Sequence, residues 1–168
     1  MESTVGRVTV RTLRPADLER IVKIDQAFTE RNRRAWFAGK LQRALADADV
    51  NISLGAEADG LLVGCLLGAV HYGEFGLPEP VAVLDTILVD PAFGRRGVGR
   101  ALVAQLVKNL AALRIERVRT EVGWAEQELM RFLAGVGFAP APRLVLELAV
   151  GEAAGRLSEE DVELVRLP

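Results

Sequence analysis

The chain has 168 residues, of which 50% are hydrophobic and 26% are charged, and its formal net charge is −2. These values predict one globular domain over 1–168 and argue against a general nucleic-acid binder, which carries a basic face. The single cysteine excludes an internal disulfide and makes a cysteine-based metal site unexpected. No apolar run reaches the roughly 18 residues of a membrane span, and the N-terminal residues lack the apolar core of a signal peptide. We therefore expect a cytoplasmic protein without a membrane partner.

Hydrophobic periodicity divides the chain into strands, with alternating apolar residues, and helices, with apolar residues three or four positions apart. In chain order, the expected elements are a strand over 8–13, a helix from Arg14 to about Asp25, a helix over 34–48, strands over 51–58, 61–70 and 81–89, a helix from the glycine-rich turn to about Arg114, a strand over 117–122, a helix over 126–134 and a strand over 144–150. Ser158-Glu159-Glu160-Asp161 has the form of a capping box for a last short helix. The order βααβββαβαβ indicates a mixed α/β fold in one unit.

The segment "LVDPAFGRRGVGRALV", residues 88–103, joins an apolar strand to an amphipathic helix through a turn rich in glycine and arginine. Its glycines let the backbone turn tightly and approach a ligand, and the unpaired amides at the start of a helix favour phosphate. Its arginines add charge that can pair with phosphate oxygens. The simpler alternative is a solvated surface turn. The candidate phosphate-binding residues are Gly94, Arg95, Arg96, Gly97, Val98, Gly99 and Arg100.

Two common phosphate-binding motifs do not fit this segment. A P-loop requires Gly-x-x-x-x-Gly-Lys-Ser/Thr, which the sequence lacks. A Rossmann fingerprint requires a third glycine where this sequence has Leu102, and it follows the first strand of its unit rather than a later one. A dinucleotide-binding enzyme is therefore kept only as a third alternative, which predicts affinity for NAD.

The same segment resembles the acyl-coenzyme A signature of the GNAT superfamily of N-acetyltransferases, Gln/Arg-x-x-Gly-x-Gly/Ala after a strand ending in Val-Asp-Pro. Aligned on Gly97 and Gly99, the first position is Gly94, which removes one side chain but leaves the backbone amides. "VRTLRPADLERIVKID" resembles the family's first strand and helix, and "GLLVGCLLGAV" resembles its third strand. "FLAGVGFAP" resembles the family's Tyr-x-x-x-Gly-Phe segment, with Leu133 in place of the tyrosine.

The resemblance implies a mostly antiparallel central sheet flanked by helices, in which one strand bulges and splays from the next to open a slot for acyl-coenzyme A. It implies acetyl-coenzyme A as co-substrate, held by the loop through its pyrophosphate and by the backbone of Ile87, Leu88 and Val89 through its pantetheine arm. The partner would be an amine acceptor, a small molecule or a protein, that attacks the thioester directly. No metal is implied, and a homodimer is left open.

Direct attack needs a free amine, so the resemblance directs attention to acids and to proton donors. Asp85 lies on the strand before the expected bulge and is the first candidate base; the alternative is a hydrogen-bonded structural acid. Glu121 is the second candidate, with a salt bridge or solvent as its alternative. Tyr72, the only tyrosine, could protonate the departing thiolate in place of the residue replaced by Leu133, as could His71 or water.

The replacement at Leu133 and the departure at Gly94 also support a different class of protein, an acyl-coenzyme A binding or sensing module with weak or no turnover. Both classes bind the coenzyme, and only the enzyme releases free thiol with amines. The lone cysteine, Cys65, lies inside an apolar strand and is expected in the core rather than in the chemistry.

Overall fold

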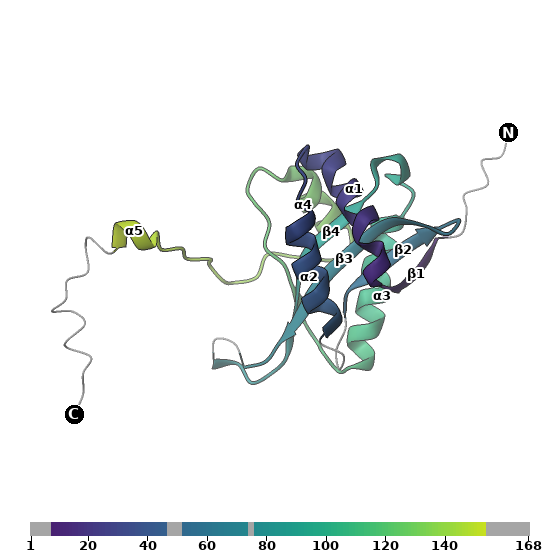
Figure 1. Ribbon diagram of the computed structural model, residues 1–168. Coiled ribbons are helices and arrows are strands. Elements are labelled where there is room, and N and C mark those ends of the chain that lie inside the picture. Colours follow the sequence, from purple (N-terminus) through teal and green to yellow (C-terminus); the bar gives the residue numbers. More distant parts are fainter. Residues whose placement is uncertain (1–7, 47–51, 74–75, 154–168) are drawn as a thin grey trace, which may run out of the picture. The chain divides into compact units, whose positions relative to one another are not determined.

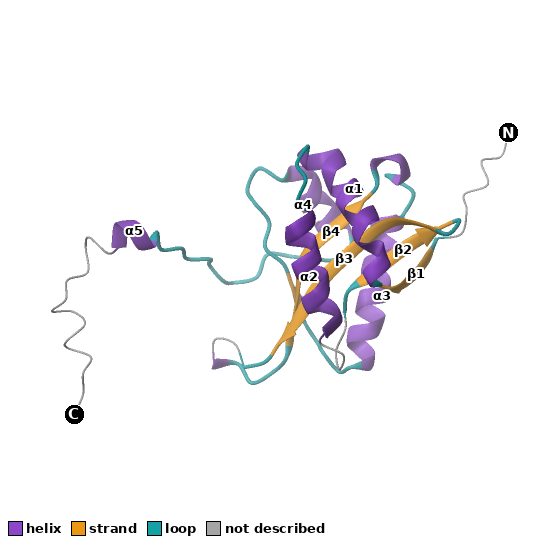
Figure 2. Ribbon diagram, in the orientation of Figure 1, coloured by secondary structure: helices purple, strands orange, loops and turns teal. Residues whose placement is uncertain are grey.

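The computed structural model describes residues 8–46, 52–73 and 76–153, which divide into two compact units at Val136. Figure 1 follows the chain by colour and Figure 2 by secondary structure. The single-domain organisation expected over 1–168 stays a prediction. The elements of the first unit are β1 (Thr9–Thr12), η1 (Pro15–Asp17), α1 (Leu18–Thr29), α2 (Arg34–Ala46), β2 (Leu54–Ala58), β3 (Leu61–His71), β4 (Val81–Val89), η3 (Pro91–Phe93), α3 (Val98–Ala112), β5 (Val118–Arg119) and α4 (Gln127–Gly135).

The first unit is built on one five-stranded sheet in the order β1-β2-β3-β4-β5. The first four strands are antiparallel, and β5 alone runs parallel to its neighbour β4. Helices α1 and α2 lie in front of the sheet in Figure 1, and α3 lies behind it. The expected mixed, mostly antiparallel sheet flanked by helices is therefore confirmed.

Apolar periodicity explains which face each helix buries. On α3, Val98, Leu102, Leu106 and Leu110 recur every four residues and are all buried. On the other side of the sheet, α1 and α2 share a core cluster with β1 and β3, which includes Cys65. Burial raises the pKa of the Cys65 thiol to about 12, so this residue is confirmed as part of the core.

The pairing of β3 with β4 is interrupted by a bulge. Leu67 pairs with Thr86 and Gly68 with Leu84, which leaves Asp85 as an extra residue in β4. A Cβ at Gly68 would lie 2.5 Å from the carbonyl oxygen of Val83, so glycine is the residue that fits beside the bulge. A bulge was expected in this strand after Asp85, at Ile87–Val89, whereas the structure places it at Asp85, which is the residue displaced from the ladder.

A charged network fixes the entry to the first helix. Arg11 of β1 binds Asp17 through two nitrogens, at 2.8 and 2.9 Å, and Glu57 of β2 through Nε at 2.7 Å. The carboxylate of Asp17 also accepts a hydrogen bond from the Arg14 amide. Asp17 is buried, and burying a carboxylate is tolerated when it is paired in this way.

Two expected strands differ from the structure. The strand expected over 117–122 is confined to Val118–Arg119, because only Ala82 and Val83 of β4 pair with it. The strand expected over 144–150 is wrong. Residues 144–149 form no ladder with another described strand, and α5 (Val150–Ala153) begins where the strand was expected to end. Within this second unit the apolar side chains of Leu144, Leu146 and Leu148 stay exposed.

The remaining differences concern element ends. The helix expected from Arg14 begins with the 3-10 turn η1, and α1 extends four residues beyond Asp25. The strand expected over 51–58 starts at Leu54, and α3 stops two residues before Arg114. Asn51, the last two residues of the helix expected over 34–48 and the proposed capping box at 158–161 lie outside the described residues.

Candidate functional site

The site begins where β4 loses its neighbour. The parallel ladder with β5 ends at Val83, so the outer edge of β4 beyond it pairs with no strand that the structure describes. Ile87, Leu88 and Val89, on this open stretch, form one wall of a cavity of about 670 Å³. We call this the β4 cavity. Its other lining residues are Asp25, Phe28, Thr29 and Arg33 on the α1 side and Ala125, Glu126, Gln127, Glu128, Leu129 and Arg131 at the start of α4.

Gly64 allows this part of β4 to lie close to α3. A Cβ on Gly64 would be 2.9 Å from the carbonyl oxygen of Leu88 and 2.9 Å from Cγ1 of Val98. Contacts this short do not occur at real Cβ atoms, so only glycine permits the approach. The cavity wall and the first turn of α3 therefore approach each other closely across Gly64 of β3.

The glycine-rich loop ends in a cluster of unpaired amides at the start of α3. The N-cap residue, Gly97, has the left-handed φ of 80°, and its carbonyl accepts the first helical hydrogen bond, from Ala101 at 2.9 Å. The amides of Val98, Gly99 and Arg100 precede that bond, so they have no intrahelical acceptor. No atom lies within 4 Å of where a Cβ of Gly97 would be, which leaves room for a ligand. This arrangement suits an anion.

The turn before the loop is braced by Asp90. Its amide donates to the carbonyl oxygen of Val63 at 2.8 Å, and its Oδ1 accepts from the Ala92 amide at 2.9 Å. Arg20 of α1 pairs with the Asp90 carboxylate and donates through Nε to the carbonyl oxygen of Leu62 at 2.8 Å. No sequence pattern indicated this pairing, because Arg20 and Asp90 are 70 positions apart.

The three arginines of the loop differ in their surroundings. Arg95 and Arg96 are exposed, and the Arg96 guanidinium lies 5.3 Å from the centre of the Phe93 ring. Arg100 donates through Nη2 to the carbonyl oxygen of Gly135 at 3.0 Å, which ties α3 to the end of α4. Part of the hydrogen-bonding capacity of Arg100 is therefore engaged within the protein.

The candidate catalytic residues are not gathered at the β4 cavity. Asp85, at the bulge, is exposed, lies 2.5 Å from Nζ of Lys40 and accepts a hydrogen bond from Thr86 at 2.8 Å. Glu121 is exposed and follows the short β5. None of the three candidates, Tyr72 included, lines the cavity.

The positions of Tyr72 and Leu133 decide whether either could supply a residue that protonates the departing thiolate. His71 pairs with Val81, so Tyr72 follows the β3 end that is roughly 20 Å of strand away from Leu88. Leu133 on α4 is only 4% exposed. The structure thus brings neither the tyrosine nor a substitute at position 133 to the open edge of β4.

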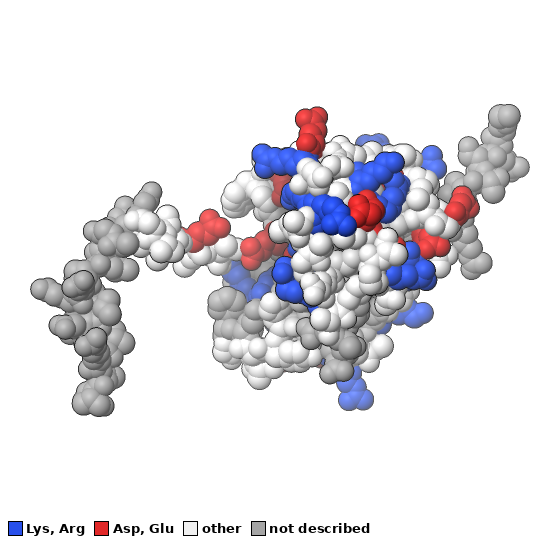
Figure 3. Space-filling view, viewed as in Figure 1, with Lys and Arg blue, Asp and Glu red and all other residues white. Residues whose placement is uncertain are grey.

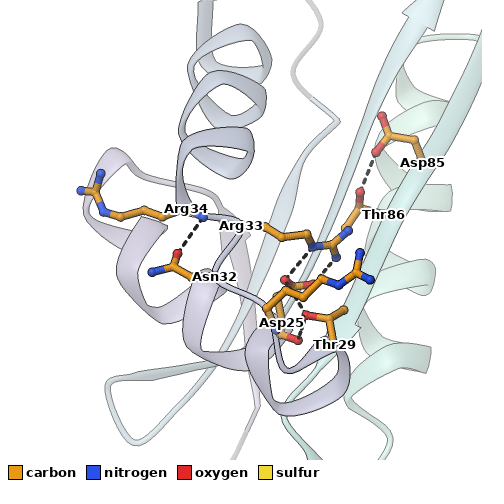
Figure 4. Close-up of polar contacts among 8 residues, drawn as sticks. Asp25, Thr29, Asn32, Arg33, Arg34, Asp85 and Thr86 are labelled. Carbon is orange, nitrogen blue, oxygen red and sulfur yellow. Dashed lines mark hydrogen bonds and ion pairs between the residues drawn. The ribbon is translucent and has the colours of Figure 1, made fainter.

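An arginine–aspartate pair on the α1 wall was missed in the sequence. Asp25 is fully buried, and its carboxylate accepts hydrogen bonds from Nε of Arg33 at 2.9 Å, from Nη2 of Arg33 and from the Thr29 hydroxyl at 3.3 Å. Figure 4 shows these contacts, with Thr86 and Asp85 of β4 drawn in the same view. The basic run Arg31-Asn32-Arg33-Arg34 was the available signal, although it does not identify which arginine faces the cavity.

Two further observations concern other classes of site. No three His, Cys, Asp or Glu side chains within 8–46, 52–73 and 76–153 come together as a metal site would require. The helices that the structure describes are all too short or too polar to cross a bilayer.

Comparison with known proteins gives relatives in both sequence and fold. Over 100 residues the chain is 34% identical to an uncharacterised protein of Mycobacterium leprae (strain TN); the match covers 60% of this chain and about a quarter, 26%, of that relative. An aminoglycoside N-acetyltransferase, AAC(6')-Iy, solved with CoA, superposes with a TM-score of 0.73 at 17% identity, covering 89% of this chain and 99% of that one. A ribosomal-protein-alanine N-acetyltransferase from Brucella melitensis biovar Abortus 2308 superposes with a TM-score of 0.68 at 16% identity, covering 85% and 99%.

The structural neighbours share the curled sheet and its flanking helices, and their low identity makes them evidence for the fold. The sequence match is more specific. Residues 18–138 match the model of the acetyltransferase (GNAT) family, a stretch that contains the bulged strand, the β4 cavity and the amide cluster of α3. The chain belongs to the acetyltransferase (GNAT) family.

Proposed function

We propose that this protein transfers an acetyl group from acetyl-coenzyme A to a primary amine, on a small molecule or on a protein N-terminus or lysine. The observation that carries the proposal is the continuity of the open β4 edge with the amide cluster of α3, across the contact that Gly64 permits. The CoA complex of the AAC(6')-Iy neighbour and the family match support the same donor.

The amides of Val98, Gly99 and Arg100 would bind the pyrophosphate, with Arg95 and Arg96 as exposed cations beside them. Gly94 and Gly97 would let the loop approach the phosphates. The backbone of Ile87, Leu88 and Val89 would pair with the pantetheine arm as an added strand does, because its outward N–H and C=O groups have no strand partner among the described residues.

The chemistry needs one bond formed and one broken. The acceptor nitrogen attacks the thioester carbonyl carbon, the C–N bond forms, the C–S bond breaks, and the proton lost by the amine balances the one gained by the thiolate. An amide on the open stretch of β4 can donate to the carbonyl oxygen as charge develops on it. Asp85 is the first candidate to accept the amine proton, through a water, and Glu121 is the second.

Coenzyme binding and turnover are tested separately. Acetyl-coenzyme A should raise the melting temperature of the protein by linkage to the native state. A panel of amines, polyamines, amino acids and peptide N-termini, scored by free thiol release, then tests transfer. No change in melting temperature at millimolar acetyl-coenzyme A would contradict the proposal.

An acyl-coenzyme A binding or sensing module is the second candidate. It is favoured by the burial of Leu133 and by the engagement of Asp85 with Lys40, which leave position 133 without a proton donor and the first candidate base already paired. The two candidates differ in one measurement. A sensing module would show the thermal shift with acetyl-coenzyme A and release no thiol above the rate without acceptor.

A further inference from the structure

The α1 wall of the β4 cavity contains the guanidinium group of Arg33, of which only one edge forms hydrogen bonds. Arg33 binds Asp25 side-on, through Nε and Nη2. An arginine carries five N–H donors in a planar fork, so this pairing leaves the end-on edge, formed by Nη1 and the second N–H of Nη2. No acceptor for that edge is found within the described parts of the chain, and 38% of the Arg33 side chain is exposed.

The guanidinium is held firmly in place. Asp25 is fully buried and anchors one edge, while the ring centres of Trp36 and Phe37 lie 5.0 and 5.5 Å from Cζ. The hydrogen bonds that Arg33 donates to Asp25 raise the pKa of Arg33 further, so the group stays charged. A planar cation fixed by a carboxylate and two rings has little freedom left to lose when it binds a second partner.

Its position relates it to the reacting end of the coenzyme, where the acceptor must also lie, rather than to the pyrophosphate site at the start of α3. Arg33 lines the cavity together with Thr29 on the wall that faces Ile87–Val89, whereas the amide cluster lies at the start of α3. Figure 4 shows Arg33 extending from the connection between α1 and α2 in the direction of β4. A group bound to its free edge would therefore lie in the same cavity as the proposed thioester.

We propose that the end-on edge of Arg33 binds a carboxylate of the acceptor, so that the preferred substrates are amines that also carry a carboxylate. A carboxylate matches the fork with two parallel hydrogen bonds, which a neutral amide cannot do. This inference rests on the proposed function and names its substrate class. It also predicts that amines carrying only positive charge are poorer acceptors for this protein than amines that carry a carboxylate.

The β4 cavity carries charges of both signs, since Asp25, Glu126 and Glu128 line it as well as Arg33 and Arg131, so the preference for a carboxylate rests on the free edge of Arg33 itself. On the face seen in Figure 3, Lys and Arg side chains lie over α1 and α2 with Asp and Glu side chains among them. Next to Arg33 in sequence, Arg34 has its charge matched by Glu19, at 2.6 Å, on the exposed outer side of the helices. Arg34 does not line the cavity, which makes it a natural control.

The test compares pairs of acceptors that present the same primary amine with a carboxylate or with the corresponding carboxamide. One pair is 4-aminobutanoate and 4-aminobutanamide; others place two to six atoms between the amine and the carboxyl carbon. The readout is the ratio of kcat/KM for the two members of a pair, from thiol release. A charge-assisted pair of hydrogen bonds predicts a ratio of about 10 to 100 in favour of the best carboxylate.

Arg33→Lys is the informative variant, because a lysine keeps a cation beside buried Asp25 but lacks the planar fork. It should lower the ratio about tenfold and leave the carboxamide rates within a factor of about three. Arg34→Lys makes the same change outside the cavity and should leave the ratio unchanged. If Arg33→Lys does not fold, the double variant Asp25→Asn/Arg33→Gln removes both charges together, and it should lower the ratio in the same way.

Binding without turnover gives an independent readout. Calorimetry of the carboxylate acceptor, in the presence of CoA that carries no acyl group, should show weaker binding to Arg33→Lys than to Arg34→Lys. Equal rates for carboxylate and carboxamide in the unmodified protein would overturn this inference alone. If none of the amines tested causes thiol release, the proposed function is overturned, and this inference with it.

Discussion

Lys40 of α2 and Asp85 of β4 form an ion pair, with 2.5 Å between Nζ and Oδ1, that joins a helix to the extra residue of the bulge. The same ammonium lies 4.5 Å from the centre of the Trp36 ring, on which Arg33 also packs. An amine that uses Asp85 as its base must therefore share the carboxylate with a resident cation. The structure leaves one question about the chemistry, which is whether Asp85 can accept a proton from the amine while it is paired with Lys40.

Asp85→Asn tests that question. If Asp85 accepts the amine proton, thiol release at neutral pH should fall by about 10²–10⁴-fold, while coenzyme binding stays normal. The loss should shrink as the pH approaches the pKa of the amine, because free amine is then present without a base. Rates within a factor of three of the unmodified protein would make Asp85 only the partner of Lys40. The pair is only partly exposed, since 45% of the Asp85 side chain but 15% of the Lys40 side chain is accessible to solvent.

The amide cluster is tested by two substitutions at Gly97 that differ in charge and hardly in shape. Asn and Asp both tolerate the left-handed φ of this residue, and open space surrounds its position. Gly97→Asp should weaken acetyl-coenzyme A binding by about tenfold or more relative to Gly97→Asn, since it places an anion beside the phosphates. Isothermal titration of both variants measures the difference, and equal affinities would remove the loop from the site.

Gly64→Ala should damage the fold and the site together. The added methyl would meet the Leu88 carbonyl and Val98, so β4 or α3 must move, at a cost of about 1–3 kcal/mol in the free energy of unfolding. Val98→Ala in the same chain relieves only the side-chain contact, so coenzyme affinity should stay reduced in the double variant. Denaturant unfolding and titration with acetyl-coenzyme A check the two effects. Full recovery of affinity in the double variant would mean that the Leu88 contact is unimportant.

Asp17 should make the fold sensitive to acid. Burial raises its pKa, but hydrogen bonds from Arg11 and from the Arg14 amide outweigh burial and hold the pKa below its ordinary value of 3.8. A carboxylate with a lowered native pKa stabilises the fold above about pH 4, and this contribution is lost as the pH falls through the native pKa. Asp17→Asn should be less stable at pH 7 and should lose less stability between pH 4 and 3. Urea midpoints at both ends of that range measure it, and parallel curves would contradict it.

The sequence predicted the elements whose pattern is long and regular. Leu102, Leu106 and Leu110 mark α3 because four-residue spacing places them on one buried face, whereas Leu113, expected in the same series, lies beyond the end of α3 and is exposed. Alternation failed for 144–150, where the pattern fits a strand but no described strand supplies ladder partners. A strand forms only when a second segment supplies its hydrogen-bond partners, and the alternation within one segment does not show whether such a partner exists.

The sequence allowed prediction only of those parts of the site that are formed by consecutive residues. The glycine-rich loop could be located because its amides, turn and helix are consecutive residues. The pairs Arg20–Asp90 and Lys40–Asp85 depend on how α1 and α2 are placed against β4, which no short pattern encodes. The 3-10 turn η3 was also missed, although Asp90-Pro91 was visible as its start.

The open edge of β4 has a consequence for how the protein behaves in solution. Beyond Val83 it presents apolar residues with outward backbone groups that no described strand covers, and such an edge can pair with a strand of another molecule. A ligand lying along Ile87–Val89 would cover that edge. Occupancy and colloidal stability would then be coupled: concentrated samples without coenzyme should aggregate first, and adding it during purification should keep more of the protein in solution.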